Sequence, residues 1–177
     1  MKSLLFSTIF SLTLLTSCFS VKSNGSQNVG AVYKKPLFVI TDIKDNTKGF
    51  SKKLKRELDE ELANLYTPSQ IILVERNEIG RTKDTIKLDS KENINSQINT
   101  AVLNLHSDVI IIFNPTHVQW ANGAISSIKY DIIAIDVISK KQIWKGNFKA
   151  GGLIGPKSYA EQAAKESYQK LKEDRIL

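Results

Sequence analysis

The single cysteine of the 177-residue chain, Cys18, closes its one long apolar run, and this arrangement limits how the rest can fold. Residues 4–15 are uncharged and rich in Leu, Phe and Ile, Lys2 precedes them, and the small residues Thr16 and Ser17 lead into Cys18. About a dozen such residues are too few to cross a hydrocarbon core that needs about 20, but they suit a secretory signal peptide. Without a second thiol, the remaining chain can form no disulfide and must be held together by a hydrophobic core.

The tetrapeptide Leu15-Thr16-Ser17-Cys18 resembles the lipobox of bacterial lipoprotein precursors, in which an aliphatic residue and two small residues precede a cysteine. The resemblance implies cleavage after Ser17, diacylglycerol on the Cys18 thiol and usually an amide-linked acyl chain, such as palmitate, on the new amino terminus. Two or more such chains hold a protein stably on a bilayer. Phe19 rather than aspartate follows the cysteine, which in enterobacterial lipoproteins favours the outer membrane. An ordinary signal peptide with a chance cysteine is the alternative.

We predict three regions along the chain. Residues 1–17 form the lipoprotein signal peptide, residues 18–35 form a lipidated flexible tether, and residues 36–177 form one globular α+β domain. The tether is predicted because its residues are polar, rich in glycine, serine and asparagine, and lack any apolar period. A chain of this length can bury about 70% of its unfolded surface, which is enough for a single stable domain.

The first half of the domain shows the pattern of a β-α-β unit. Residues 37–43 and residues 71–75 are rich in β-forming residues, so both segments are predicted strands. The first of them directly follows a proline, as an opening strand can. Between them, apolar residues recur at spacings of three and four, which predicts a helix with one apolar stripe. A connection of this kind implies parallel pairing of the two strands. The stripe consists of Phe50, Leu54, Leu58, Leu62 and Leu65.

The middle of the domain predicts a loop, a helix and a central strand. Residues 77–90 are polar and charged, which indicates a loop. A second apolar stripe over residues 94–105 predicts a helix. The continuous apolar run 109–113 then predicts a strand that is buried on both faces.

The last part of the chain predicts an antiparallel hairpin and a final helix. Residues 125–138 and 142–148 are rich in β-branched residues, and a turn at residues 139–141 separates them. Residues 158–161 form a capping box, which predicts the start of the helix. The predicted fold is therefore a single α+β domain with a mixed sheet and three helices, in the order β-α-β-α-β-β-β-α.

This layout resembles that of small envelope lipoproteins. The resemblance rests on a strand followed by Asp45-Asn46-Thr47 and a long helix, and on the later hairpin segment IDVISKKQIWKG at residues 135–146. It is nearest to the amino-terminal domain of the Tol-associated periplasmic propeller protein and to the peptidoglycan-synthase activator lipoproteins. The resemblance implies an envelope protein of this general layout, and it transfers no functional residue beyond the lipobox.

Motifs for catalysis or cofactor binding are incomplete in this sequence. Residues 151–158 superficially resemble a P-loop, but Pro156 stands where phosphate binding needs a backbone N–H. An EF-hand that started at Asp42 would break at its third and sixth positions. The two histidines, His106 and His117, have no further ligands at the short spacings of a zinc site. We therefore predict no catalytic residue, no cofactor and no metal site, and a protein that is not an enzyme.

We expect the chain to bind a partner through residues 114–124, predicted to be a loop, and through the neighbouring basic hairpin. The candidate residues are Trp120 and His117 in the loop and Lys145 in the hairpin. Exposed aromatic residues often anchor interfaces, although core packing of Trp120 is the alternative. The chain carries a net charge of +7, and its hairpin lysines favour an anionic wall or lipid polymer, unless they serve to prevent edge-to-edge aggregation.

The leading functional hypothesis is a lipid-anchored, non-catalytic binding or assembly module of the bacterial cell envelope. We expect it in the outer membrane, facing the periplasm, with the membrane and an envelope protein or polymer as partners and no nucleic acid. One alternative is an envelope hydrolase that acts on cell wall or glycan with carboxylates from separate segments. Another is a self-assembling structural lipoprotein that pairs exposed sheet edges.

Overall fold

The structure is a computed structural model that describes residues 20–23, 32–43, 49–63, 70–76, 78–82, 85–88, 92–121, 124–151 and 156–177. Its elements confirm the predicted α+β fold and the predicted order of the main elements. The helices are α1 (Phe50–Leu62), α2 (Glu92–Leu105) and α3 (Pro156–Glu173). The strands are β1 (Ser20–Ser23), β2 (Pro36–Ile43), β3 (Ile71–Arg76), β4 (Glu78–Thr82), β5 (Thr85–Leu88), β6 (Val109–Ala121), β7 (Ala124–Asp136) and β8 (Gln142–Gly151).

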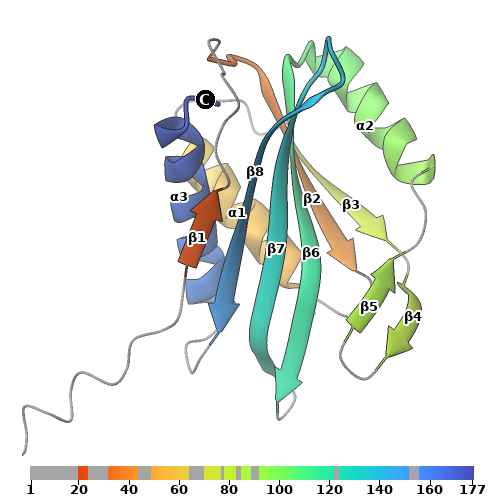
Figure 1. Cartoon of the computed structure of the whole chain (residues 1–177), viewed down its shortest axis with the longest axis vertical. Helices are drawn as coiled ribbons and strands as arrows, with labels where there is room; N and C mark the ends of the chain where they lie inside the picture. The colour runs from red at the N-terminus through yellow and green to blue at the C-terminus, as the bar shows by residue number, and fades with distance from the viewer. Residues whose placement is uncertain are drawn as a thin grey trace, which may run out of the picture.

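A six-stranded mixed sheet forms the centre of the domain, in the order β1-β8-β7-β6-β2-β3 (Figure 1). β2 pairs in parallel with β3, as the β-α-β spacing predicts, and also with β6. β6, β7 and β8 follow one another in antiparallel pairs, which confirms the predicted hairpin. Its turn is closed by Asp136, whose carboxylate accepts a hydrogen bond from the Ser139 backbone N–H at 2.6 Å. Hydrogen bonds with Ser139 hold the pKa of Asp136 below its ordinary value.

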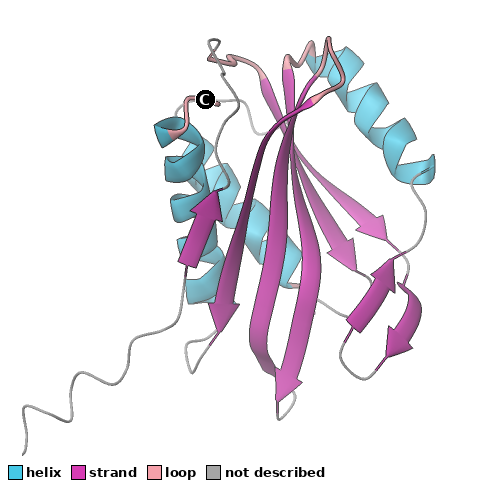
Figure 2. Ribbon diagram, in the orientation of Figure 1, coloured by secondary structure: helices cyan, strands magenta, loops and turns pink. Residues whose placement is uncertain are grey.

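The helices form unequal layers on the two faces of the sheet (Figure 2). α1 and α3 cover one face, and the main core lies beneath them, including Phe38, Leu54, Leu58, Phe113 and Trp144. α2 covers part of the other face, where a smaller cluster contains Leu37, Val39, Val74, Ile98 and Ile110. Helices therefore cover both faces of residues 37–40 of β2 and of the start of β6, which explains why both segments are continuous apolar runs.

Two sets of strands form where the sequence predicts none. β1 lies within the segment predicted to be a tether, and it pairs antiparallel with β8 at the edge of the sheet. The four residues of β1 are too few to show an alternation of apolar and polar side chains. They pair with β8, which would otherwise be the edge strand of the sheet. β4 and β5 form a separate two-stranded hairpin within the predicted loop at residues 77–90. Residues 33–35 are also attached to the domain, since the backbone N–H groups of Lys34 and Lys35 donate hydrogen bonds to the Asp108 carboxylate. The tether prediction for residues 24–31, which lie outside the described residues, stays a prediction.

Proline is involved at two of the boundaries that differ from the prediction. α3 begins at Pro156, two residues before the predicted capping box at Ser158, because proline suits the first position of a helix. Residues 114–124 were predicted to form a loop, and this was wrong, since β6 and β7 continue through this segment as one long hairpin. The pairing register shifts between Pro115 and His117, and this irregularity lets β6 pass a residue that cannot donate a backbone hydrogen bond.

A buried pair of hydroxyl groups ties the start of α1 to the sheet. Ser51 Oγ donates a hydrogen bond to the Thr41 carbonyl oxygen at 3.1 Å, and the oxygen atoms of the Ser51 and Tyr130 hydroxyl groups lie 2.6 Å apart. Because the Ser51 proton is directed at Thr41, the Tyr130 hydroxyl is the donor to Ser51. Burial raises the pKa of Tyr130, which keeps this donor protonated.

Replacing Tyr130 with phenylalanine is expected to lower the free energy of unfolding by about 1 kcal/mol, because buried Ser51 loses one of its two hydrogen bonds. Denaturant unfolding followed by circular dichroism measures this change. Tyr168→Phe is the matched control, since Tyr168 is half-buried and its hydroxyl makes no hydrogen bond within the described residues. Equal losses for the two variants would contradict the assigned role of the Ser51–Tyr130 bond.

Candidate binding surface

One face of β6, β7 and β8 turns away from α1 and α3 and carries polar and charged side chains. These positions alternate along each strand with core residues such as Tyr130 and Phe148. α2 packs on β2, β3 and the first residues of β6, so no described helix covers the rest of this face (Figure 1). We call its polar part the open face. Its members are Asn114, His117, Lys129, Asp131, Lys145, Asn147 and Lys149.

Strand register places three basic residues of the open face in one row. His117 pairs with Lys129, and Lys129 pairs with Lys149, so the three positions lie side by side across β6, β7 and β8. Residues directly opposite in antiparallel strands have Cβ atoms about 5 Å apart. Lys149 is exposed, whereas His117 and Lys129 are half-buried. We call these three residues the basic row.

The open face is positively charged because its lysines outnumber its one carboxylate. Asp131 Oδ2 lies 3.9 Å from Lys145 Nζ, and the two side chains are 30% and 48% exposed. Among the described residues, neither Lys129 nor Lys149 forms an ion pair. Like charges directly opposite on neighbouring strands destabilise a sheet. An anion placed over the basic row would relieve this repulsion.

The structure brings two of the three predicted partner-binding residues to this surface. His117 lies on β6 and Lys145 on β8, both on the open face, and β7 runs between them. Trp120 lies near the end of β6, paired with Ile125, and its side chain is outside the described part of the chain. Cys18 also lies outside the described residues. The roles assigned to these residues stay predictions.

Lys129 and Lys149 were not among the three individual candidates, although both belong to the lysine-rich hairpin that was expected to attract an anionic partner. Their importance comes from the register that places them opposite each other. A slip of one residue in register would turn every side chain of a strand to the other face. One local signal of this surface was present in the sequence, namely the alternation of side chains along a strand. It places Lys129 and Asp131 on one face of their strand, and Lys145 and Lys149 on one face of theirs.

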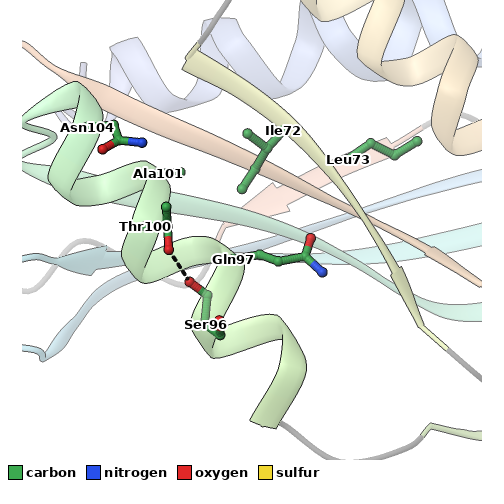
Figure 3. A pocket seen from close by; sticks show the side chains of 7 residues that line it. All are labelled: Ile72, Leu73, Ser96, Gln97, Thr100, Ala101 and Asn104. Atoms are coloured by element: carbon green, nitrogen blue, oxygen red, sulfur yellow. Dashed lines mark hydrogen bonds between the residues drawn. The ribbon is translucent and has the colours of Figure 1, made fainter.

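A shallow groove of about 530 Å³ lies between α2 and the edge strand β3 (Figure 3). Thr100 Oγ1 donates a hydrogen bond to the Ser96 carbonyl oxygen at 3.0 Å, so part of its polar wall is satisfied within α2. The lining residues include no titratable side chain, which favours packing contacts over acid–base chemistry in this groove. They are Ile72, Leu73, Ser96, Gln97, Thr100, Ala101 and Asn104.

Carboxylates gather in a crevice of about 400 Å³ lined by α1 and α3 residues Arg56, Glu57, Glu60, Glu61 and Glu161. Glu57 is buried and pairs with Arg56, whose Nε also lies 3.8 Å from Glu60 Oε1. The hydrogen bond with Glu57 raises the pKa of Arg56. A hydrolytic carboxylate pair usually keeps one member protonated beside an ionised one. The contacts of Arg56 with Glu57 and Glu60 instead indicate a structural ion-pair network, which offsets part of the negative charge of this crevice.

Two further features of the described part of the chain concern metal binding and membrane crossing. It contains no group of three or more histidine, cysteine, aspartate or glutamate residues placed to hold a metal ion. None of its helices is both long and apolar enough to cross a membrane. Neither finding concerns Cys18, which lies outside that part.

Comparison with known proteins shows a likeness of fold. No protein-family model matches the chain, and no curated protein sequence matches it. The PelC dodecamer from Paraburkholderia phytofirmans superposes with a TM-score of 0.52 at 11% identity, over 89% of this chain and 97% of that chain. A single-residue variant of that dodecamer superposes with a TM-score of 0.50 at 9% identity, over 89% of this chain and 99% of that chain. The chain therefore shares the PelC fold. At such low identity, the likeness extends to the fold alone.

Proposed function

We propose that the chain is a lipid-anchored protein of the bacterial envelope whose domain binds an anionic envelope component without catalysing a reaction. The observation that supports this most directly is the basic row, in which Lys129 and Lys149 lie opposite each other without an ion pair among the described residues. The strands fix the backbone of both lysines, so binding an anion requires ordering of their side chains alone. Lys145, on β8, extends the same positive surface.

The anchor in this proposal is an acyl group on Cys18. Its support is the match of Leu15-Thr16-Ser17-Cys18 to a lipobox after a charged start and an apolar run. The intact mass of the mature protein, extracted from membranes, is expected to correspond to a chain that begins at Cys18 and carries fatty acids. A mature chain that retains its leader, or that carries no fatty acid, would contradict the anchor. The proposed outer-membrane location, facing the periplasm, depends on it.

Charge reversal at Lys145 tests the binding surface. Lys145→Glu is expected to weaken retention of the detergent-solubilised protein on an immobilised polyanion by about tenfold at low salt, because each lysine near an anionic surface contributes about 1 kcal/mol. Its contact with Asp131 is exposed, so the fold should be little affected. Lys165→Glu on α3 is the matched control, since this exposed lysine lies on the opposite side of the sheet. Equal weakening by both variants would contradict a specific surface.

Self-assembly is the second candidate function, and two observations favour it. The protein that shares this fold, PelC, forms a dodecamer. The sheet also ends in two strands, β1 and β3, that each have one neighbour among the described strands. Pairing between such edges would join copies head to tail. Light scattering of the lipidated protein in detergent is expected to give a multiple of the protomer mass if this candidate is correct, and the mass of one protomer if it is not.

A further inference from the structure

The position of β1 shortens the connection between the proposed anchor and the folded domain. A tether through residues 18–35 would leave the domain free to move far from the bilayer. β1 instead places Ser20 in the sheet, opposite Lys149. Ser20 is two residues from Cys18, and two residues of extended chain span about 7 Å. An acyl group on Cys18 would therefore hold this edge of the sheet directly at the membrane surface.

The edge that β1 occupies is continuous with the basic row. Ser20 pairs with Lys149, Lys149 with Lys129, and Lys129 with His117, so one line of positions crosses four strands. Neighbouring strands lie about 4.8 Å apart, so His117 is about 15 Å from Ser20. This distance is small enough for all three basic residues to reach the surface that holds the lipid. The acidic crevice lies among α1 and α3, on the other side of the sheet.

We infer that the basic row docks the domain on anionic lipid headgroups of the same membrane that holds Cys18. This inference rests on the proposed function, because it needs the acyl anchor. The anionic component that the domain binds is then the layer of lipid headgroups around the acyl chains of Cys18. Stable attachment of a peripheral protein commonly combines acyl chains with a basic patch, and here strand pairing places the two side by side. The open face then lies against the bilayer, and α1 and α3 face away from it.

Lysine labelling of the full lipidated protein in vesicles tests this orientation. In phosphatidylcholine vesicles that contain phosphatidylglycerol, Lys129 and Lys149 are expected to be acetylated at least about fivefold more slowly than in phosphatidylcholine vesicles alone. High salt is expected to remove the difference without releasing the protein from the vesicles. Lys52 and Lys165, exposed on α1 and α3, are the internal controls and should label equally in both.

A proline variant separates the role of β1 from that of the anchor. Val21→Pro removes a backbone donor from β1 and is expected to abolish the protection of Lys149 while the protein still floats with the vesicles. Ser26→Pro, which lies after β1, is the matched control and should leave the protection unchanged. Equal protection in both variants would contradict a docking geometry set by β1.

The outcomes distinguish this inference from the proposed function. A protein that floats with the vesicles but labels equally in both lipid compositions would overturn the docking inference and leave the anchor intact. A protein that carries no fatty acid and does not float would overturn both. Heparin serves as a soluble polyanion probe. If heparin protects Lys129 and Lys149 where anionic vesicles do not, the docking inference is overturned, and an anionic polymer becomes the partner of the basic row.

Discussion

Replacing Trp144 with alanine is expected to lower the free energy of unfolding by about 3–5 kcal/mol, the range for a buried aromatic residue. Trp144 is 1% exposed in the core between β8 and α3, so the change leaves a large cavity. Its indole Nε1 donates a hydrogen bond to Asp174 Oδ2 at 2.7 Å, which ties β8 to the residue that follows α3. Denaturant unfolding followed by circular dichroism measures the loss. Gln142→Ala, at an exposed position of the same strand, is the control and should change stability by less than about 0.5 kcal/mol.

The packing of Trp144 over Gly146 gives a sharper test of the same contact. A Cβ atom at position 146 would lie 2.8 Å from Cζ2 of the Trp144 ring, which is too close for a buried ring held by a hydrogen bond. Gly146→Ala is therefore expected to cost about 1–3 kcal/mol. The cost should fall in a Trp144→Phe background, because phenylalanine lacks the outer ring of the indole. An unchanged cost in that background would show that the clash is not with Trp144.

Reversing two charges of the basic row together is expected to have the largest effect on binding. Lys129→Glu with Lys149→Glu should weaken the affinity for anionic vesicles or an immobilised polyanion by at least about 100-fold at low salt. The two substitutions change the local charge by four units at neighbouring positions. Conservative replacement of both lysines by arginine should retain binding, since the positive charge is kept. Circular dichroism checks that both variants remain folded.

A charge-matched variant decides whether the position of the lysines matters. Lys52→Glu with Lys165→Glu makes the same change in net charge on α1 and α3, on the opposite side of the sheet. This variant is expected to lose less than about fivefold in affinity, because those positions lie on the opposite side of the sheet from the open face. If both double variants weaken binding equally, net charge rather than the open face controls the interaction, and the proposed surface is wrong.

The helices and central strands were predictable because their signals are local. The stripe of Leu54, Leu58 and Leu62 predicts the buried face of α1, and all three are buried. The apolar run at residues 109–113 predicts the doubly covered start of β6 for the same reason. The predicted loop at residues 114–124 was wrong, because an irregularity in the pairing of β6 accommodates Pro115 without ending the strand.

The candidate surface was only partly predictable, because it depends on pairing between distant segments. His117 and Lys145 were predicted, but the reason for their proximity was not, since the predicted loop at residues 114–124 is part of a long hairpin. Lys129 and Lys149 become neighbours through the pairing of β7 with β8. β1 escaped prediction because its residues are polar and few, and its partner β8 lies more than a hundred residues later.

The amino-acid sequence by itself determined the elements of the core, because hydrophobic periodicity is a property of neighbouring residues. It also excluded any disulfide within the chain, because there is a single cysteine. Only the tertiary structure decided that Ser20, Lys149, Lys129 and His117 form one line across the sheet. Register and edge pairing arise from backbone hydrogen bonds between segments far apart in the chain, and no local pattern encodes them. The charged surface and its distance from Ser20 are consequences of that pairing.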